Sequence, residues 1–521
     1  MPAEEWVKVA DEAELEDGVP ISVEVEGEDV LVVRIGEELH ACGGKCTHYG
    51  GPLAEGLLSG HTITCPWHAA RFDVRTGEMD APPALDDEPH YPAKVEDGAV
   101  YVGKPSEPEP PEIEGEDDRL FAIVGGGAAG NAAAETLRRE GFAGRIVLIT
   151  AEDDGPYDRP TLSKEFMSGE AKPEWLPLRS DDFYQNWGIE LLTGRCVSAL
   201  DQDEKKLSFE DGEELKFDSA LLATGAVPRT LDLPGAELQG CFTLRGLADA
   251  RAIGEALEET ETAVMLGAGF IGMEVASGLR ERDIEVHIVA PEDIPMERVF
   301  GPDVGSWIRA RHEDKGVTFH TGTTAREITG DGEVSGVVLE DGTEIACDMV
   351  LVAVGVDPAV DWLEGSGLVE DGVVPVDEHL MTRADGIYAA GDIAAIPYPQ
   401  TDEPYRIEHW IVAERTGQHA ARTMLGGTAA YAEVPFFWTM QCGTPVDFVG
   451  FGGKPDQTVL RGDLETGEFL AGYYRDGRLR AIAGAGRGRE VLIVERLIWA
   501  EQNISPEDFA DTDVSFEDML G

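Results

Sequence analysis

Two cysteine–histidine pairs are the residues of this 521-residue chain best suited to hold a metal. One residue separates Cys46 from His48, two separate Cys65 from His68, and sixteen lie between the pairs. Two thiolates and two imidazoles can hold the two irons of a [2Fe–2S] cluster, or together surround one tetrahedral zinc ion. Zinc fingers usually pair Cys with Cys and His with His, whereas each pair here has one of each. The pattern therefore favours iron over zinc.

Two glycine-rich segments have the spacing that binds dinucleotide phosphates. The glycines are Gly125, Gly127 and Gly130 in the first segment, and Gly267, Gly269 and Gly272 in the second. Each segment follows a short apolar run, and glycines at these places allow a tight turn with a helix N-terminus facing the phosphates. One such motif is weak evidence. Two copies about one domain length apart predict two dinucleotide sites.

The elements that must position these residues change in type along the chain. Residues 1–104 contain short alternating segments such as 21–25 and 30–35, which predict a small all-β domain. Residues 105–118 are rich in Pro and Glu and predict an extended linker on which that domain could swing. From residue 119 a strand–helix–strand pattern predicts two α/β Rossmann-like domains. From about residue 431 the pattern indicates an α+β domain.

The charge balance argues against a nucleic acid partner and indicates a salt-rich environment. Asp and Glu number 102 against 41 Lys and Arg, a formal charge of −61 at pH 7. Self-repulsion of this size opposes a compact fold, but in molar salt the Debye length falls to about 3 Å and most of the penalty disappears. We therefore expect a halophilic protein of a salt-rich cytoplasm. No nucleic acid partner is expected, because binding phosphates requires a basic face.

The N-terminal residues and the hydropathy also favour a cytoplasmic protein. Residues 1–6 contain neither the basic stretch nor the apolar core of a secretory signal. No apolar run approaches the roughly 18 residues that span a membrane, so no membrane partner is expected. Seven cysteines in such a chain indicate metal ligands and buried thiols rather than disulfides.

Residues 5–104 resemble the Rieske [2Fe–2S] domain, in which two His replace two Cys at one iron. The resemblance rests on the two Cys–His loops, the first of which reads Cys-Thr-His-Tyr-Gly-Gly-Pro-Leu from residue 46. It implies that the cluster ligands are Cys46, His48, Cys65 and His68.

Four positions depart from the Rieske proteins of respiratory chains. Those proteins carry an extra Cys in each loop, where this chain has Gly51 and Trp67, so their disulfide is excluded here. They also place hydroxyl donors after the last His, where this chain has Ala70 and Phe72. Losing these donors lowers the cluster's potential, which implies a low-potential, ferredoxin-like cluster suited to a flavin donor. Cys42 matches no ligand position and is expected to be a free thiol.

Residues 119–515 resemble the ferredoxin reductases of aromatic-ring dioxygenases and, more closely, the apoptosis-inducing-factor branch of the same flavoproteins. One form of that branch also carries an N-terminal Rieske domain. Besides the glycine segments, residues 156–164, 223–225 and 390–392 match. The order of the folds implies FAD on the first and NAD(P)H on the second. The expected domains are a Rieske domain at 1–104, a linker at 105–118, an FAD domain at 119–245 with 367–430, an NAD(P) domain at 246–366, and a C-terminal reductase or dimerisation-like domain at 431–521.

The resemblance assigns further residues to FAD. Expected contacts besides the first glycine segment are Arg159, Lys164, Ala223, Thr224, Gly225, Gly391 and Asp392. Asp392 falls on the flavin's ribityl chain. Glu152 is expected at the adenosine ribose, although the family sometimes has its acid at the position of Ala151.

Two residues are expected to act where the flavin meets the nicotinamide. Lys164 and Glu274 correspond to an ion pair beside the flavin N5, where the lysine would tune the flavin's charge. Four further residues fall on positions that line the nicotinamide side: Phe270, Glu408, His409 and Trp438.

Specificity between NADH and NADPH depends on the end of the strand at 285–289. An acid there would bind the ribose 2′-hydroxyl and repel a 2′-phosphate, but the position holds Ala290. Glu292 and Asp293 follow, and no Arg precedes Arg298. We expect NADH to be preferred. Residues 150–195 contain no Cys, which argues against the dithiol chemistry of disulfide reductases that share this fold.

These patterns predict an NAD(P)H-dependent oxidoreductase that passes electrons through FAD to a Rieske cluster and on to an unidentified acceptor. Two alternatives stay open. One is an NADH-binding redox-sensing protein of the apoptosis-inducing-factor type, and the other is an electron-supply component of an oxygenase or nitrite reductase. The oligomeric state is also open, a homodimer being one alternative.

Overall fold

The computed structural model describes residues 6–108, 110, 111, 113, 115–180, 182–398 and 404–520. The expected domains therefore include positions outside the described residues: 1–5, 109, 112 and 114, 181, 399–403, and 521. The described ranges form an all-β domain, two α/β domains with parallel sheets, and an antiparallel sheet with helices, which confirms the predicted fold class. None of the helices in these ranges combines the length and the apolar character needed to cross a bilayer.

The N-terminal domain consists of three small antiparallel sheets. Its strands are β1 (Val7–Asp11), β2 (Ile21–Val25), β3 (Glu28–Ile35), β4 (Glu38–Gly43), β5 (Leu57–Ser59), β6 (Thr62–Thr64), β7 (Arg71–Asp73), β8 (Met79–Ala81), β9 (His90–Tyr91), β10 (Ala93–Glu96) and β11 (Ala99–Val102). The sheet orders are β1-β11-β10, β2-β3-β4-β9 and β5-β6-β7-β8. One Cys–His pair lies between β4 and β5 and the other between β6 and β7, so two turns on one domain present all four ligands.

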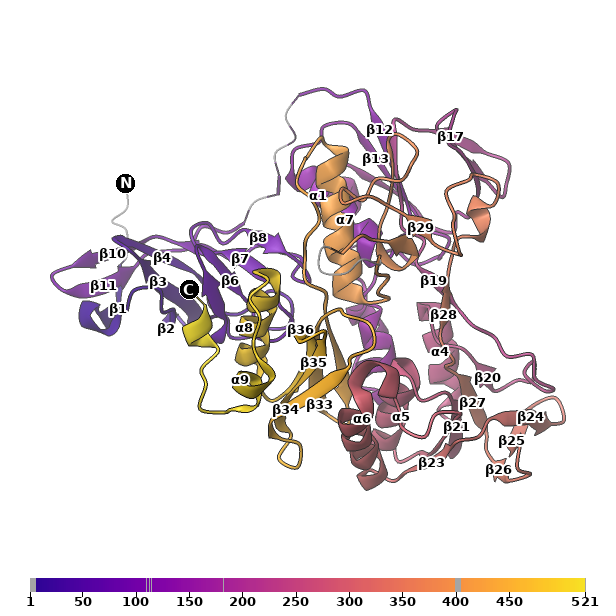
Figure 1. The fold of residues 1–521 in the computed structure, drawn as a ribbon. Coiled ribbons are helices and arrows are strands. Elements are labelled where there is room, and N and C mark those ends of the chain that lie inside the picture. Colours follow the sequence, from indigo (N-terminus) through magenta and orange to yellow (C-terminus); the bar gives the residue numbers. More distant parts are fainter. Residues whose placement is uncertain are drawn as a thin grey trace.

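The first residues of the predicted linker are hydrogen-bonded to the N-terminal domain. The Ser106 amide donates to the His90 carbonyl at 2.8 Å, and the His90 amide donates back at 3.2 Å. The next domain begins with β12, which lies apart from the N-terminal domain in Figure 1.

The first α/β domain contains a five-stranded parallel sheet of order β14-β13-β12-β18-β30. Its strands are β12 (Leu120–Val124), β13 (Arg145–Ile149), β14 (Ile189–Leu192), β18 (Ser219–Leu222) and β30 (Ile387–Ala389), with α1 (Ala128–Arg139), α2 (Glu165–Ser168), α3 (Phe183–Asn186) and α7 (Trp410–Met424). Smaller pairings involve β15 (Val197–Asp201), β16 (Lys206–Phe209), β17 (Glu214–Lys216), β29 (Val374–Pro375) and β31 (Ala394–Ala395). Every residue of β12 is buried, as expected for a parallel strand covered on both faces. Helices α1 and α7 lie side by side (Figure 1).

The second α/β domain repeats this plan with the order β20-β27-β21-β22-β23. Its elements are β20 (Cys241–Phe242), β21 (Thr262–Leu266), β22 (Glu285–Ala290), β23 (Val317–Thr321), β27 (Met349–Val352), α4 (Leu247–Ala256), α5 (Phe270–Glu281) and α6 (Glu297–Asp314). A small sheet of β24 (Ala325–Gly330), β25 (Val334–Leu339) and β26 (Glu344–Ala346) is added to it, and β19 (Ala226–Pro228) pairs with β28 (Val356–Pro358) where the chain crosses between the domains. Because β20 pairs with β27, this sheet includes residues before the predicted start at 246. The domain boundaries themselves stay a prediction.

The C-terminal domain joins the N-terminal domain to the two α/β domains. Its antiparallel sheet has the order β32-β33-β36-β35-β34, and its elements are β32 (Phe436–Gln441), β33 (Thr444–Gly450), β34 (Gln457–Asp463), β35 (Glu468–Arg475), β36 (Arg478–Ala485), α8 (Gly488–Trp499) and α9 (Pro506–Ala510). In Figure 1 α8 and α9 lie beside the N-terminal domain, and α5 and α6 lie beyond the other side of the sheet. One apolar cluster contains Leu57 and Ala69 together with Val491 and Leu492 of α8, so these two domains share a core.

Candidate electron-transfer site

The first glycine segment forms the turn between β12 and α1. Gly125 has φ +121°, and a Cβ there would lie 2.0 Å from the Ala223 carbonyl oxygen, so only glycine fits. The segment's last glycine, Gly130, packs against the turn itself. By contrast, a Cβ on Gly127 would meet nothing within 4 Å. The turn therefore leaves open space at the N-terminus of α1, where a diphosphate is expected.

The second glycine segment has the same construction between β21 and α5. Gly267 has φ +115°, and a Cβ there would lie 2.3 Å from the Ala353 carbonyl oxygen. Gly272 packs against the Gly267 carbonyl, and Gly269 faces open space. Two unrelated stretches of sequence thus fold into matching phosphate-binding turns.

A single cavity of about 870 Å³ connects the first turn with the second α/β domain and the C-terminal sheet. Fifteen of the predicted site residues line it: Gly125, Gly127, Glu152, Arg159, Lys164, Ala223, Thr224, Gly225, Phe270, Glu274, Gly391, Asp392, Glu408, His409 and Trp438. Gly130, Gly267, Gly269 and Gly272 belong to the two turns but are not among the lining residues. A cavity of this size and shape fits a large dinucleotide such as FAD, and the structure brings the predicted residues together around it.

Two carboxylates at the cavity wall are held in place by arginines. Glu152 accepts a hydrogen bond from the Arg159 guanidinium at 2.7 Å and another from the Tyr157 hydroxyl. Asp392, only 7% exposed, accepts one from Arg245 at 2.8 Å. Fixed carboxylates suit the sugar hydroxyls of a dinucleotide, which donate hydrogen bonds. Sequence reasoning missed Arg245, because no motif surrounds it.

Lys164 and Glu274 form a nearly buried ion pair. The Lys164 ammonium lies 3.0 Å from Glu274 Oε2, with side chains 12% and 6% exposed. The Ser163 hydroxyl donates to the same carboxylate at 2.6 Å. Ser163 was not predicted, although it precedes Lys164 in a segment that the resemblance covers. The pair places a positive charge at the cavity wall, where it can act on a bound ring system.

His409 lies at the same wall and has one nitrogen left unpaired by the part of the chain that the structure describes. Its Nε2 lies 3.2 Å from the Trp438 carbonyl oxygen, while the buried Nδ1 has no hydrogen-bond partner among the described residues. Burial, assisted by the charge of Lys164, lowers the pKa of His409 to about 3. The imidazole is therefore neutral at working pH.

The four predicted cluster ligands lie on two adjacent turns of the N-terminal domain. The Nδ1 atoms of His48 and His68 are 3.1 Å apart. Cys46 and Cys65 are buried, and their thiols lie within hydrogen-bonding reach of each other. Nowhere in the described ranges do three His, Cys, Asp or Glu side chains gather as one metal site. The donors form a thiol pair and an imidazole pair instead, as the two irons of a Rieske cluster require.

Gly51 and the residues after His68 explain how this site differs from respiratory Rieske proteins. A Cβ on Gly51 would lie 2.7 Å from Cys65 Sγ and 3.2 Å from the Trp67 ring, so no side chain fits there. Ala70 and Phe72 are fully buried and offer no hydroxyl to the sulfurs. Cys42 is buried as well, and burial raises the pKa of its thiol to about 12, which makes it inert.

The imidazole pair faces the rest of the protein. The His68 ring packs against the Trp438 indole with centroids 4.4 Å apart, and His48 lies at 6.4 Å from the same ring. β32 of the C-terminal domain thus packs against the histidine rim, the edge of the cluster domain formed by His48 and His68. Trp67 remains 47% exposed. Since Trp438 also lines the cavity, one indole separates the two candidate redox sites.

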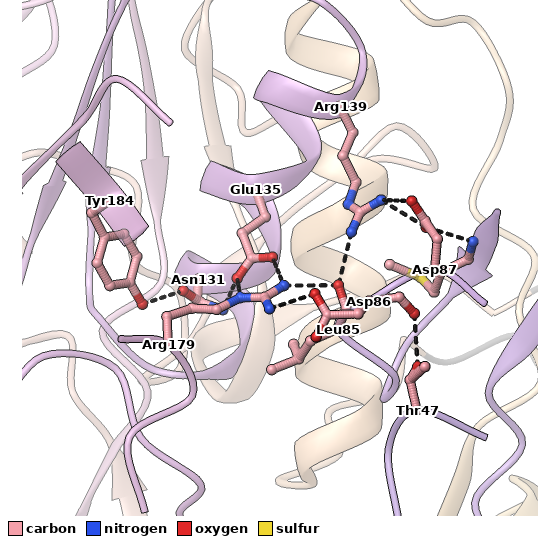
Figure 2. Close-up of polar contacts among 10 residues, drawn as sticks. Thr47, Leu85, Asp86, Asp87, Asn131, Glu135, Arg139, Arg179 and Tyr184 are labelled. Atoms are coloured by element: carbon pink, nitrogen blue, oxygen red, sulfur yellow. Dashed lines mark hydrogen bonds and ion pairs between the residues drawn. The ribbon is translucent and has the colours of Figure 1, made fainter. Parts of the chain in front are cut away.

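Arginines of the FAD domain hold one loop of the N-terminal domain (Figure 2). Arg179 contacts Asp86 at 2.6 Å, and Arg139 contacts Asp87 at 2.8 Å. Both guanidinium groups also donate to the Leu85 carbonyl, each at 2.8 Å. On the other side of this loop, the Thr47 hydroxyl donates to the Asp86 carbonyl at 2.7 Å. The loop thus links Arg139 and Arg179 directly to the turn that carries Cys46 and His48.

A second set of contacts holds the other ligand turn. The buried Arg415 of α7 donates to the Ala69 carbonyl at 2.8 Å, one residue after His68. Arg71 forms an ion pair with Glu433 at 2.6 Å. Because charged hydrogen bonds hold both ligand turns, the structure shows the cluster domain docked at the cavity.

Comparison with known proteins agrees with this architecture. The pyridine nucleotide-disulphide oxidoreductase family matches residues 120–417, the Rieske [2Fe-2S] domain matches residues 5–92, and the reductase C-terminal domain matches residues 436–520. The Rieske match decides the question left open between iron and zinc in favour of a [2Fe–2S] site.

Individual relatives cover most of the chain. Apoptosis-inducing factor 3 of Homo sapiens is 36% identical over 90% of this chain and 80% of its own length. The benzene 1,2-dioxygenase system ferredoxin–NAD(+) reductase subunit of Pseudomonas putida is 34% identical over 77% of this chain and 97% of its own. The solved structure of the ferredoxin reductase for the CYP199A2 system of Rhodopseudomonas palustris superposes with a TM-score of 0.75 at 32% identity, covering 78% of this chain and 100% of that one. The chain therefore belongs to the pyridine nucleotide-disulphide oxidoreductase family and carries a Rieske [2Fe–2S] domain at its N-terminus.

Proposed function

We propose that this protein takes electrons from NAD(P)H, passes them through FAD to its own Rieske cluster, and delivers them to an external acceptor. The contact that supports this most strongly is the one between His68 and Trp438, because it places a cluster ligand beside the wall of the dinucleotide cavity. FAD and the cluster, when bound, convert a two-electron hydride donor into a source of single electrons.

The residues of the chain position the nucleotides and set the local charge. The two glycine turns bind diphosphates at the N-termini of α1 and α5. Glu152 and Asp392, each fixed by an arginine, bind sugar hydroxyls of FAD. Lys164 places a positive charge beside the flavin, and Glu274 keeps that ammonium in position. No side chain has to donate or accept a proton during hydride transfer itself, so orientation and electrostatics carry the catalysis.

NADH is the proposed electron donor. The strand β22 ends at Ala290 without the acid that usually recognises a ribose. Arg298 lines the cavity, but its guanidinium lies 3.4 Å from the Glu292 carboxylate. Because this carboxylate partly neutralises the arginine, Arg298 would bind a 2′-phosphate less strongly. Glu292, which follows the strand end, is the carboxylate proposed to accept a hydrogen bond from the ribose 2′-hydroxyl.

The external acceptor is proposed to be a one-electron carrier of the ferredoxin type or an oxygenase that takes electrons directly. The Pseudomonas putida relative serves a benzene dioxygenase system as its ferredoxin–NAD(+) reductase subunit. This chain also includes a Rieske domain, so we propose that it combines a reductase with its own one-electron carrier. The charge of −61 supports a salt-rich cytoplasm as the setting.

Anaerobic titration with NADH tests the proposed function. Protein purified in molar KCl is followed by absorbance and by low-temperature electron paramagnetic resonance. We expect bleaching of the flavin followed by the rhombic signal of a reduced Rieske cluster. Reduction of the flavin with a cluster that stays oxidised would refute internal transfer, and would favour an NADH sensor.

A further inference from the structure

Glu274 is the end of a chain of buried polar groups that leads away from the cavity. Its carboxylate, 5% exposed, accepts hydrogen bonds on both oxygens. Lys164 and Ser163 contact Oε2, at 3.0 and 2.6 Å, and the Thr439 hydroxyl donates to Oε1 at 2.6 Å. The first two donors belong to the FAD domain. The third comes from β32 of the C-terminal sheet, so a separate element fixes the other oxygen.

The chain continues from Thr439 into the protein interior. The Gln441 amide nitrogen donates to the Thr439 hydroxyl oxygen at 2.8 Å. His312 Nε2, on α6, lies 2.9 Å from the Gln441 amide oxygen. Gln441 and His312 are fully buried, and Thr439 is 1% exposed. None of these three residues lines the cavity, so their contribution to the site has to pass through Glu274.

The direction of each hydrogen bond is determined by the number of hydrogens available. A hydroxyl has one hydrogen, and Thr439 gives it to the carboxylate, so Thr439 has to accept from the Gln441 amide. The amide oxygen then faces His312, which must donate from Nε2. The opposite nitrogen, Nδ1, is buried without a partner in the described part of the chain, and burial lowers the pKa of His312. The imidazole is therefore neutral, with its hydrogen on Nε2.

We propose that His312, Gln441 and Thr439 are positioning residues that keep the Glu274 carboxylate directed at Lys164. Aligned donors polarise one another, so the hydroxyl that ends the chain is a stronger donor than an isolated threonine. A buried carboxylate that loses such a donor takes up a proton more readily. A protonated Glu274 would no longer hold the Lys164 ammonium beside the flavin. This inference rests on the proposed function, in which that ammonium sets the charge near the flavin.

The decisive variant is Thr439→Val, which removes the hydroxyl and keeps the shape. We expect the pKa that limits flavin reduction by NADH on the acid side to rise by about 1–2 units, because a hydrogen bond to a charged group is lost. Thr439→Ser keeps the hydroxyl and should retain the wild-type pH profile. Thr458→Val, on β34 at the opposite edge of the same sheet, is a matched control that should also leave the profile unchanged.

A second readout does not depend on turnover. Infrared difference spectra of the flavin-loaded protein, taken at a pH between the acid limbs of the wild-type and Thr439→Val profiles, should show the carbonyl band of a protonated carboxylic acid in Thr439→Val. That band should be missing in the wild type and in the double variant Thr439→Val/Glu274→Gln. Gln441→Met should produce the same band more weakly, because the donor chain is shortened rather than removed.

If Thr439→Val keeps the pH profile of the wild type and shows no carboxylic acid band, the proposal is overturned. The row of polar side chains from His312 to Thr439 would then only contribute to packing. That outcome is separate from failure of the proposed function. If NADH does not reduce the wild-type flavin, the function fails, while the infrared band still reports on Glu274.

Discussion

The imidazole of His68 packs against the indole of Trp438, with the ring centroids 4.4 Å apart and the planes inclined by 43°. His68 belongs to the Rieske domain, and Trp438 belongs to β32 of the C-terminal domain. The indole also lines the dinucleotide cavity and lies 5.3 Å from the ring of His409. A single aromatic contact thus connects a predicted cluster ligand with the wall of the dinucleotide cavity. This arrangement makes transfer within one chain the expected route.

Trp438 should control the rate of internal electron transfer. In Trp438→Ala the cluster should be reduced roughly tenfold more slowly after the flavin, equivalent to about 1.4 kcal/mol of barrier, because the packed contact is lost. Trp438→Phe should lie between this variant and the wild type. Stopped-flow absorbance at flavin and cluster wavelengths measures both steps. Unchanged cluster reduction in Trp438→Ala would show that the electron takes another path.

The arginine contacts of Figure 2 should keep the Rieske domain docked. Arg139→Ala removes a partly buried charged contact with Asp87, and should raise the undocked population by roughly tenfold. Limited proteolysis within residues 105–118 should then be faster. Arg145→Ala is the control, since Arg145 pairs with the exposed Glu190 within the FAD domain. Equal cleavage rates in the two variants would argue against a docking role for Arg139.

Asp447 should make stability depend on pH. It lies opposite Trp438 on β33, and burial raises the pKa of its carboxyl from 3.8 to about 8. Between these values the folded protein keeps the proton while the unfolded chain releases it, so the free energy of unfolding falls as pH rises from about 4 to about 8. Asp447→Asn should flatten this decline. Denaturant unfolding at pH 5 and pH 8, in the same salt, measures it. An equal decline in both proteins would contradict the assignment.

The acidic surface should make folding depend on salt. With 102 acidic against 41 basic residues, repulsion is long-ranged at 0.1 M salt, where the Debye length is about 10 Å, and weak at 1 M, where it is about 3 Å. The melting temperature should therefore rise from 0.1 M to 2 M KCl. A melting temperature that is flat in KCl would refute halophilic adaptation.

Much of the site follows from local sequence patterns. The glycine turns at Gly125 and Gly267 could be predicted because a tight turn before a helix requires glycine at fixed spacing. The proximity of Cys46, His48, Cys65 and His68 could be predicted because metal binding restricts residue types within a few positions. The segment at 21–25 was predicted with the bounds of β2, since alternating residues between turns favour a strand.

Contacts between distant segments could not be predicted in the same way. Arg245 meets Asp392 across 147 residues, and Arg179 meets Asp86 across 93 residues. The polar chain from His312 to Thr439 joins two domains, and none of its members has a spacing that signals a partner. The covered position of the histidine rim depends on how the domains pack, which a Pro- and Glu-rich linker does not determine. Resemblance to known reductases placed Trp438 at the nicotinamide, but its contact with His68 required the structure.

The most direct test of transfer within one chain is the effect of protein concentration on the rate. Flavin reduced by a single equivalent of NADH is followed by stopped-flow absorbance while the cluster accepts an electron, over a hundredfold range of protein concentration. Transfer through the His68–Trp438 contact predicts a first-order rate constant that does not change with dilution. A rate that falls in proportion to concentration would show transfer between molecules, and would contradict the account.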